Sequence, residues 1–403
     1  MSRPRQVVML ARVLPHHGIG GMQAVAWDLA TALAARGVGV TVLTAAIPGR
    51  AADFVDAGVR VRALDGTSWR RYGRSWWRAT RRVFEQEGLA CCDLVFSVSA
   101  GGFGLLPLRA RLPQVPFVLQ AHGTSIGEVI SKWRSGSAKA IASSVRNLAW
   151  IGKDLLAYRQ FDAIVAVGEA VARDLSTWPI DRFVDRRRLH VIPNGIDTEV
   201  FAPDPAARRR VRREFDWDDA LRVVVSASRL HRQKGLDLGL DAFARLAQQE
   251  PDWRYLIVGE GPELEPLQRR AAALGVAERV HFTGAVGRER IAAYLNAADV
   301  LLFTTTRVEG NPLNVLEALA VGLPVIASRH LATGAATPAG LVRVDERDAA
   351  AVAAALRDVL AARPRPRSAL PRGASMRESV DAHLALFDAL IASRGQHRPV
   401  GGR

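Results

Sequence analysis

The chain alternates short apolar runs with longer segments of helical periodicity from near residue 7 to about residue 327. In the first part, the expected strands are 7–13, 38–43, 93–98, 117–121, 163–167 and 190–192, with helices between them, such as 22–36. Strands that alternate with helices form parallel sheets covered by helices on both faces. The sequence therefore predicts an α/β protein with doubly wound sheets.

The alternation is interrupted once, after the turn signal Asn194-Gly195, and then starts again. The second series has expected strands at 221–227, 255–258, 280–283, 300–303 and 325–327, and expected helices at 236–249, 263–274, 288–297 and 313–321. We place the domain boundary in the region 196–219, and describe the arginine-rich run 208–213 as a linker. The prediction is two Rossmann-like domains, 1–200 and 201–375. Residues 376–394 are expected to form a C-terminal helix that packs back on the first domain, and 395–403 a disordered tail.

Length and composition set limits on the class of protein. At 403 residues, with 49% hydrophobic and 24% charged residues, the chain suits two ordinary globular domains. No apolar run approaches the roughly 18 residues that span a bilayer, and the N-terminus lacks the apolar core of a signal peptide. Cys91 and Cys92 are adjacent, so they offer no disulfide framework or metal cluster. We expect a cytoplasmic protein.

The formal net charge of +15 belongs mainly to the first half, where residues 1–195 contain 26 Lys and Arg against 14 Asp and Glu. Basic and aromatic residues are interleaved in 69–78 and again in 132–153. Such segments suit an anionic membrane surface, with tryptophan at the interface and basic side chains on the headgroups. The hypothesis is peripheral attachment at the inner face of the membrane; the alternative is a solvated arginine-rich face with packed aromatics.

One stretch of the second domain, 309–317, places two carboxylates, Glu309 and Glu317, eight residues apart around an expected helix start. Pro312 suits the first helical turn, where its missing N–H costs nothing. The backbone N–H groups of Gly310, Asn311 and Leu313 would point out of the helix start, which favours an anion. A nucleotide diphosphate sugar fits such a site. Because the two carboxylates lie about two turns apart along one helix, we disfavour a general acid/base pair.

Two cations, Arg229 and Lys234, lie five residues apart in a loop that follows an expected strand and precedes a helix. Such loops lie at the carboxyl ends of the strands, where ligands bind in doubly wound sheets. Both side chains could converge on one diphosphate, Arg229 as a planar fork and Lys234 as a point charge. The alternative is two solvated surface cations.

Glycine-containing loops follow three other strands. Gly259 and Gly261 follow the expected strand 255–258, and the loop from Gly284 to Val286, after 280–283, could reach a base or ribose. In the first domain, Gly20-Gly21 permits close approach to a ligand at a helix start. Tight packing or a plain turn is the alternative in each case. A dehydrogenase is disfavoured, because Gln23 replaces the third glycine of the dinucleotide fingerprint.

The order of these motifs resembles the retaining glycosyltransferases of family 4 (glycosyl transferases group 1), which have the GT-B fold of two Rossmann-like domains facing across a cleft. The motifs are Arg229 with Lys234-Gly235, the segment 259–262, Phe282-x-Gly284, and Glu309-x7-Glu317. Gly20-Gly21, His122-Gly123 and Asn194 at the domain junction agree with this pattern. Two departures are Ser228, where the family usually has glycine, and 329–340, which lacks the usual Gly-Gly-x-Pro-Glu sequence.

The resemblance implies a hexosyltransferase that moves a sugar from a UDP- or GDP-sugar to an acceptor hydroxyl, with retention and without a metal or other cofactor. Arg229 and Lys234 would neutralise the departing diphosphate, Glu309 would bind the sugar, and Glu317 the ribose. His122 would face the sugar from the other domain. Gly259 and Val286 would lie near the base. The acceptor would be a sugar or a lipid-linked molecule in polysaccharide, glycolipid or other glycoconjugate biosynthesis.

Other functions remain as alternatives at this point. Asp216-x-Asp218, the one Asp-x-Asp sequence, precedes a strand in the expected linker, and we interpret it as surface acid. A nucleotide-sugar epimerase of the same fold would need other acid/base residues, and a phosphorylase would need a pyridoxal lysine. A nucleic-acid-binding protein is suggested only by the basic pI of about 11.0, without any recognised nucleic-acid-binding module.

Overall fold

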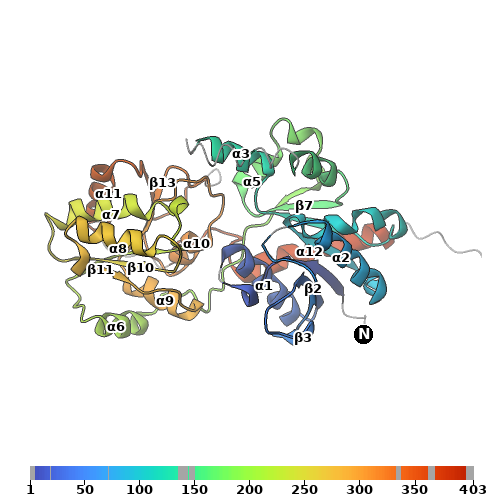
Figure 1. The fold of residues 1–403 in the computed structure, drawn as a ribbon, viewed down its shortest axis with the longest axis horizontal. Coiled ribbons are helices and arrows are strands. Elements are labelled where there is room, and N and C mark those ends of the chain that lie inside the picture. Colours follow the sequence, from blue (N-terminus) through green and yellow to red (C-terminus); the bar gives the residue numbers. More distant parts are fainter. Residues whose placement is uncertain are drawn as a thin grey trace, which may run out of the picture. The chain divides into compact units, whose positions relative to one another are not determined.

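The computed structural model describes residues 5–18, 20–70, 72–134, 144, 150–332, 337–361 and 368–395 (Figure 1). The chain forms two compact units, of which unit 1 contains Met1–Gly195 and Met376–Arg403, and unit 2 contains Ile196–Ser375. The first crossing between the units therefore falls five residues before the expected boundary at 200. Helix α12 (Met376–Gly395) ends one residue beyond the expected 394, and the expected tail from 396 onward lies outside the described residues.

Unit 1 is built on an eight-stranded sheet of order β3-β4-β2-β1-β5-β6-β7-β8. Its neighbouring strands are parallel except for β3 and β4. The strands are β1 (Gln6–Leu10), β2 (Gly39–Ala45), β3 (Asp53–Asp56), β4 (Val59–Leu64), β5 (Leu94–Val98), β6 (Phe117–Ala121), β7 (Ala163–Ala166) and β8 (Leu189–Val191).

Helices cover both faces of this sheet, as its apolar strands require. They include α1 (Gly21–Ala35), α2 (Arg74–Gln86), α3 (Ser125–Arg134) and α5 (Glu169–Leu175), with a 3-10 segment at Ser99–Arg111. Alternate residues of β1 point to opposite faces. Val7 and Met9 pack in the cluster that contains residues of α1 and α12, whereas Val8 and Leu10 pack in the cluster that contains α2. Helix α12 thus completes the core of unit 1.

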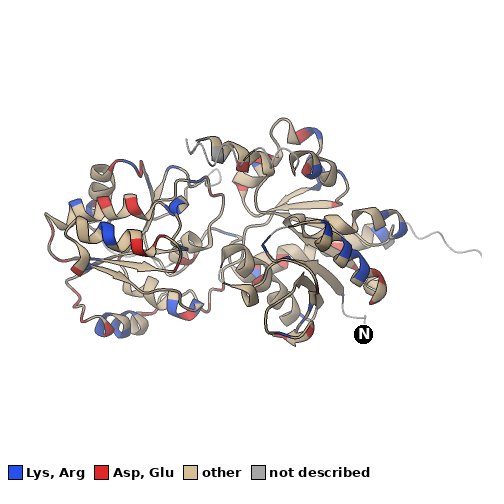
Figure 2. Cartoon of the chain, in the orientation of Figure 1, with Lys and Arg blue, Asp and Glu red and all other residues tan. Residues whose placement is uncertain are grey.

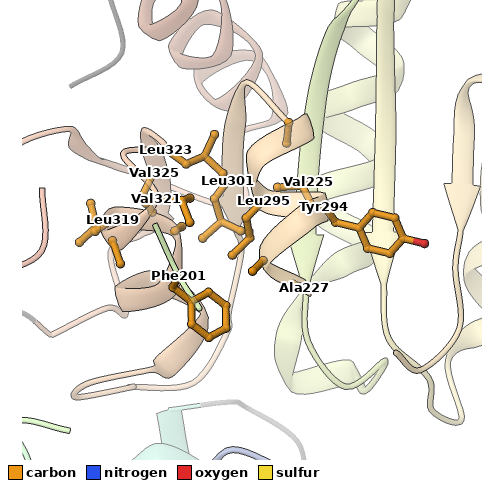
Figure 3. Packing of buried hydrophobic residues seen from close by; sticks show 14 of the residues in the cluster. Phe201, Val225, Ala227, Tyr294, Leu295, Leu301, Leu319, Val321, Leu323 and Val325 are labelled. Carbon is orange, nitrogen blue, oxygen red and sulfur yellow. The ribbon is translucent and has the colours of Figure 1, made fainter. Parts of the chain in front are cut away.

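Unit 2 has a six-stranded parallel sheet of order β11-β10-β9-β12-β13-β14. Its strands are β9 (Arg222–Ala227), β10 (Trp253–Val258), β11 (Val280–Phe282), β12 (Val300–Phe303), β13 (Val325–Ser328) and β14 (Leu341–Val344). One face is covered by α6 (Pro205–Glu214), α9 (Arg288–Ala297) and α10 (Leu313–Ala320), the other by α7 (Leu236–Ala247), α8 (Leu264–Ala273) and α11 (Ala349–Ala361). Figure 3 shows the first of these cores, where Val225 and Leu301 of the sheet meet Leu295 of α9.

The arginine-rich run 208–213 was expected to be a linker, and this prediction was wrong. It forms α6, whose Arg residues are coloured blue on the ribbon of Figure 2 and whose N-terminus is capped by the Asp204 carboxylate. Arg208 and Arg212 both pair with Asp299, at 2.9 and 2.7 Å. The charge pattern concealed the helix, because two of its arginines face the interior of unit 2.

Several short elements were not expected from the sequence, including the hairpin of β3 and β4, strand β14 and helix α11. The hairpin turns at Ala57-Gly58, and both residues have positive φ angles (46° and 77°). Its first strand, β3, has no apolar run from which a strand could be predicted. Among the described residues, no helix combines the length and apolar character that crossing a membrane would require.

Candidate active site

Unit 2 has a topological switch point between β9 and β12. The sheet continues from β9 to β10 in one direction, and β12 lies on the other side of β9. The loops that leave these two strands, 228–235 and 304–312, therefore diverge at the carboxyl edge of the sheet. Ligands of open α/β sheets bind in the crevice at such a point.

The two loops are joined by an ion pair between Lys234 and Glu309. Lys234 ends a short 3-10 turn before α7, and its Nζ lies 2.6 Å from Oε1 of Glu309. Both side chains are about one-fifth exposed, at 22% and 21%. Nζ also lies 5.6 Å from the centre of the Phe303 ring, and the Thr305 hydroxyl is 3.3 Å from the same carboxylate oxygen. The pair is fixed in place yet reachable from solvent.

Close contact between the loops depends on Gly235. Its φ is +60°, and a Cβ at this position would lie 2.1 Å from the carbonyl oxygen of Thr304. Instead, the Thr304 hydroxyl donates to the Gly235 carbonyl at 2.7 Å, and the Thr306 N–H donates to Gln233 at 2.9 Å. A side chain at 235 would push Lys234 away from Glu309, so Gly235 serves the geometry of the pair.

The other side of Glu309 is held by the segment that follows β13. The Glu309 N–H donates to the His330 carbonyl at 3.1 Å, and the Glu309 carbonyl accepts from the Ala332 N–H at 2.9 Å. This segment belongs to the stretch that departs from the family's usual sequence. It therefore still supports the backbone of Glu309, although part of it, 333–336, lies outside the described residues.

Helix α10 begins at Leu313, and the expectation for Pro312 needs a small correction. Pro312 is the N-cap, with an extended backbone (φ −72°, ψ 130°), rather than a member of the first turn. Gly310 and Asn311 precede it. The first N–H groups of a helix, beginning here with that of Leu313, have no acceptor within the helix. Nδ2 of Asn314 donates to the Ala227 carbonyl at 2.9 Å, which ties the helix start to the end of β9.

Glu317 lies on α10, whereas Glu309 lies in the loop before it, so the expectation that both carboxylates lie along one helix was wrong. Glu317 is 8% exposed, and its Oε1 lies 3.9 Å from Nη2 of Arg288. The two carboxylates thus each have their own cation, which fits binding roles better than a shared proton. Arg288, at the start of α9, was not among the predicted site residues. Its contact joins positions that are distant in sequence, so no local pattern indicated it.

Arg229 does not join the Lys234–Glu309 pair. Its side chain is exposed and forms no ion pair with any residue that the structure describes. Its predicted convergence with Lys234 on a diphosphate stays a prediction.

The glycines after β10 have packing roles, as the alternative interpretation held. A Cβ on Gly259 (φ +134°) would lie 2.0 Å from the Ser228 carbonyl oxygen, and one on Gly261 would lie 2.3 Å from that of Leu230. The Gly259 N–H donates to the Gly284 carbonyl at 2.9 Å. The three loops are therefore bound to one another. Val286 packs against the core of unit 2, and ligand contact by Gly259 or Val286 stays a prediction.

The predicted site residues of unit 1 lie at the carboxyl edge of its sheet. Gly20 caps α1 and Gly21 is its first residue; a Cβ on Gly21 would meet no heavy atom within 4 Å, so space inside the unit does not require this glycine. Asn194 is buried beyond β8. His122 follows β6, with Nε2 3.1 Å from Oε1 of Gln120, and desolvation lowers its pKa to about 4. His122 is therefore neutral at pH 7, and its role toward a sugar stays a prediction.

The sequence Asp216-Trp217-Asp218 lies inside unit 2, not in a linker between the domains. Both aspartates are exposed, whereas Trp217 is buried and stacks on Phe215. The Asp218 carboxylate accepts from the N–H groups of Ala220 and Leu221, at 2.9 and 3.0 Å. Across the described part of the chain, no group of three or more His, Cys, Asp or Glu side chains could hold a metal ion.

The basic-aromatic segment 69–78 does not present its tryptophans as one surface. Its second half, 74–78, is the start of α2, where Trp76 is 1% exposed and its Nε1 donates to the Gly101 carbonyl at 2.9 Å. Trp77 packs against the same core. Trp69 is 38% exposed, and Trp133 of α3 is 61% exposed. The assignment of Trp76 to a membrane interface was therefore wrong, because this side chain fills the core.

Comparison with known proteins shows that the chain is similar to glycosyltransferases. Residues 207–374 match the model for glycosyl transferases group 1, and residues 19–200 match the model for glycosyltransferase family 4. Sucrose-phosphate synthase from Thermosynechococcus elongatus has the same fold, with a TM-score of 0.70 at 21% identity over 97% of this chain and 98% of that one. The two doubly wound domains are those of a GT-B glycosyltransferase.

Relatives with described activities share this class. A GDP-mannose-dependent alpha-(1-6)-phosphatidylinositol monomannoside mannosyltransferase from Mycolicibacterium smegmatis is 41% identical over 218 residues, which are 51% of this chain and 54% of the relative. The enzyme of the same name from Mycobacterium tuberculosis (strain CDC 1551 / Oshkosh) is 33% identical over 317 residues, 74% of each chain. The chain belongs to glycosyltransferase family 4.

Proposed function

We propose that this glycosyltransferase is a retaining, metal-independent hexosyltransferase that uses a nucleotide diphosphate sugar. The observation that carries the proposal is the Lys234–Glu309 pair at the β9/β12 switch point, beside the start of α10. A lysine ammonium and a helix N-terminus both favour a diphosphate, while a carboxylate favours the hydroxyls of a sugar. A single ligand that carries a diphosphate next to a sugar would contact the lysine, the helix start and the carboxylate.

In the proposed reaction, the acceptor hydroxyl attacks the anomeric carbon on the face from which the diphosphate departs. The bond between that carbon and the phosphate oxygen breaks, and the diphosphate leaves with the electron pair. The hydroxyl proton passes to the departing phosphate, so no side chain acts as a nucleophile. Lys234 and Arg229 stabilise the charge that develops on the leaving group, a contribution usually among the largest in enzymes. Glu309 binds the transferred sugar and Glu317 the ribose.

The names of the relatives suggest the first donor and acceptor to test. Both mannosyltransferases are described as GDP-mannose-dependent and as acting on a phosphatidylinositol monomannoside. We infer GDP-mannose as the donor and a glycolipid as the acceptor. The reaction would then belong to glycoconjugate or polysaccharide biosynthesis at the cytoplasmic face of a membrane. The exposed Trp69 and Trp133 are the side chains that could reach a lipid surface.

Donor turnover tests the proposal. The protein would be incubated with GDP-mannose, UDP-glucose and an ADP-sugar, and nucleotide release measured with and without a chelator. We expect release from one donor, unchanged by chelator, and a loss of roughly 100-fold or more in Lys234→Ala. Arg232→Ala is the matched control, because Arg232 belongs to the same turn but is 86% exposed. Chelator-sensitive turnover would contradict the metal-free mechanism, and equal loss in both variants would contradict the role of Lys234.

A further inference from the structure

Unit 1 has a switch point of its own, between β1 and β5, and two side chains stand at its carboxyl edge. The carbonyl of Arg12, just after β1, accepts from the Ala45 N–H and the Thr44 hydroxyl, at 3.1 and 3.2 Å. The hydroxyl of Tyr72, just before α2, donates to the carbonyl of Val98 at the end of β5, at 3.2 Å. Arg12 and Tyr72 thus lie where an open α/β sheet binds ligands.

Arg12 carries a positive charge that unit 1 does not compensate. Its guanidinium lies over the Tyr72 ring, 4.4 Å from the ring centre. Nε and Nη1 are buried and have no hydrogen-bond partner among the described residues. Every Asp and Glu of the chain lies in the described part, and none forms an ion pair with Arg12. Arg12 is half-buried, and leaving buried N–H groups of a charged side chain unpaired is costly, so we expect this side chain to receive its counter-charge from a ligand.

Arg212 in unit 2 is an arginine with a structural role, and it provides a comparison for Arg12. Its Nε, Nη1 and Nη2 donate to the carbonyls of Ala297, Asp218 and Leu221, and Nη2 also pairs with Asp299. All its donors are therefore used inside the unit. Arg12 differs: it contacts Tyr72 through its stacking and a side-chain hydrogen bond, but its Nε and Nη1 have no partner among the described residues.

A second cation without a carboxylate stands on the same aromatic cluster, which we define as Tyr72, Trp77 and Trp150. Nζ of Lys153 lies 5.0 Å from the Trp77 ring centre and 5.1 Å from that of Trp150. Trp150 in turn lies 5.9 Å from Trp77 and 6.4 Å from Tyr72. Lys153 is exposed and forms no ion pair with the described residues. One aromatic cluster therefore supports two cations that lack counter-charges.

A cavity of about 460 Å³ adjoins the cluster and is lined in part by Tyr72. Its other walls are 66–68, which follow β4, and 73–75 at the start of α2. They supply the hydroxyls of Ser68 and Ser75 and the guanidinium of Arg74. The volume is within the range of small-molecule sites. The side chains that line it are polar or basic and, among the residues that the structure describes, include no carboxylate, so the cavity favours an anionic or neutral ligand over a cationic one.

We propose that Arg12, held on the Tyr72–Trp77–Trp150 cluster, binds a phosphate group of the acceptor, with Lys153 strengthening the positive potential and the adjoining cavity receiving the rest of that molecule. The proposal rests on the proposed function, since it names the chemical class of the acceptor. A phosphomonoester of a soluble sugar and a phosphodiester of a lipid present the same charged oxygens to Arg12.

Calorimetric titration of the full chain tests the site. The Lys234→Ala background would be used, so that phosphate held by Lys234 does not contribute. The probes are inorganic phosphate, glucose 6-phosphate and, as the neutral control, glucose. Arg12→Gln should weaken phosphate binding roughly tenfold or more, the usual size for a hydrogen bond to a charged group. Arg12→Lys should retain part of it. Arg78→Gln is the matched control, because Arg78 is exposed on α2 and does not line the cavity.

The source of the phosphate is distinguished by flotation with vesicles of phosphatidylinositol or phosphatidylcholine. Arg12-dependent flotation with phosphatidylinositol alone indicates a lipid diester, and Arg12-dependent binding of glucose 6-phosphate alone indicates a soluble monoester. Absence of saturable phosphate binding, or equal binding in Arg12→Gln, overturns the site; thermal melting verifies that each variant is folded. If the chain binds phosphate through Arg12 but turns over no nucleotide sugar, the site stands and the proposed function is contradicted.

Discussion

Lys234 and Glu309 neutralise each other, which means that a diphosphate at the switch point would share the lysine with a carboxylate. Glu309→Gln keeps the shape of the side chain but removes the competing charge. We expect nucleoside diphosphate to bind roughly two- to fivefold more tightly, because ion pairs that solvent can reach contribute about 1 kcal/mol or less. Turnover of the nucleotide sugar should fall, since the amide binds sugar hydroxyls more weakly.

Calorimetry with GDP and UDP measures this effect. Glu263→Gln is the control, because Glu263 pairs only loosely with the exposed Arg232, at 3.7 Å. Weaker nucleotide binding in Glu309→Gln would show that the carboxylate supports the nucleotide rather than competing with it.

The site residues show which contacts a sequence can predict. Lys234 and Glu309 could be predicted together because each follows a parallel strand, and the loops after neighbouring parallel strands meet at one edge. Arg288 and Arg12 could not, because their environment depends on contacts between distant segments. The sequence predicted that glycines are needed after β10 but not their role, since Gly259 and Gly261 make room for the close approach of the loop after β9.

At the scale of elements, the loop after β10 provides a direct test of that packing role. Gly259→Ala would place a Cβ 2.0 Å from the Ser228 carbonyl oxygen, on a backbone of φ +134°. We expect a loss of roughly 2 kcal/mol or more in the free energy of unfolding, because both strain and overpacking apply. Gly287→Ala is the matched control: it lies in the next loop, has φ −69°, and meets no heavy atom within 4 Å. Urea unfolding measures both, and equal stability would remove the packing argument.

A second prediction concerns helix α6 and the ion pairs that Arg208 and Arg212 form with Asp299. Asp299→Ala would leave the buried Arg212 and the neighbouring Arg208 with carbonyl partners only. Removing one partner of a buried pair typically costs about 3–5 kcal/mol, so unit 2 should unfold at much lower denaturant concentration.

The control for α6 is Glu214→Gln, which removes the exposed pair with Arg290 at the other end of the helix. Its effect should be far smaller, because solvent screens that pair. If both variants lost a similar free energy of unfolding, burial of Arg212 would not determine how much the network stabilises unit 2.

The elements themselves were mostly predictable, and two segments that were misinterpreted, those of α6 and α2, have a common cause. Helices 288–297 and strands 117–121 and 300–303 form within the expected bounds, because their apolar periodicity is regular. The sequence of α6 reads as a solvated charge run, and that of α2 as a membrane-facing segment. In both, arginine or tryptophan side chains turn inward to partners that local pattern does not reveal.

At the scale of the whole molecule, unit 1 should depend on a helix that follows unit 2 in sequence. Phe387 of α12 is fully buried in the core of unit 1, so Phe387→Ala should cost about 3–5 kcal/mol there. Hydrogen exchange should increase in β1, β2 and β5 but not in β9 and β12. Phe243→Ala, equally buried in unit 2, should give the reverse pattern. Faster exchange in both units of either variant would show that they unfold together.

The same helix makes the stability of unit 1 depend on pH. Burial lowers the pKa of His383 to about 4, so its folded-state pKa lies below the unfolded value near 6.5. Between these values the unfolded chain binds the proton and the native protein does not. Stability is therefore full above pH 6.5 and is lost as the pH falls toward 4. His122 acts in the same direction.

Denaturation at pH 7 and pH 5 measures the effect, and His383→Gln should flatten the dependence. Gln can preserve the donor to the Ser379 carbonyl, which His383 Nδ1 contacts at 2.7 Å. An unchanged slope would assign the pH dependence to other groups.

The return of α12 to unit 1 has a consequence for how the polypeptide is made. Unit 2 is one continuous segment, Ile196–Ser375, inserted between the two segments of unit 1. A ribosome completes all of unit 2 before it begins the helix that closes the core of unit 1. Unit 1 therefore begins before unit 2 but is completed after it, and its sheet lacks the layer that α12 forms until all of unit 2 has been synthesised.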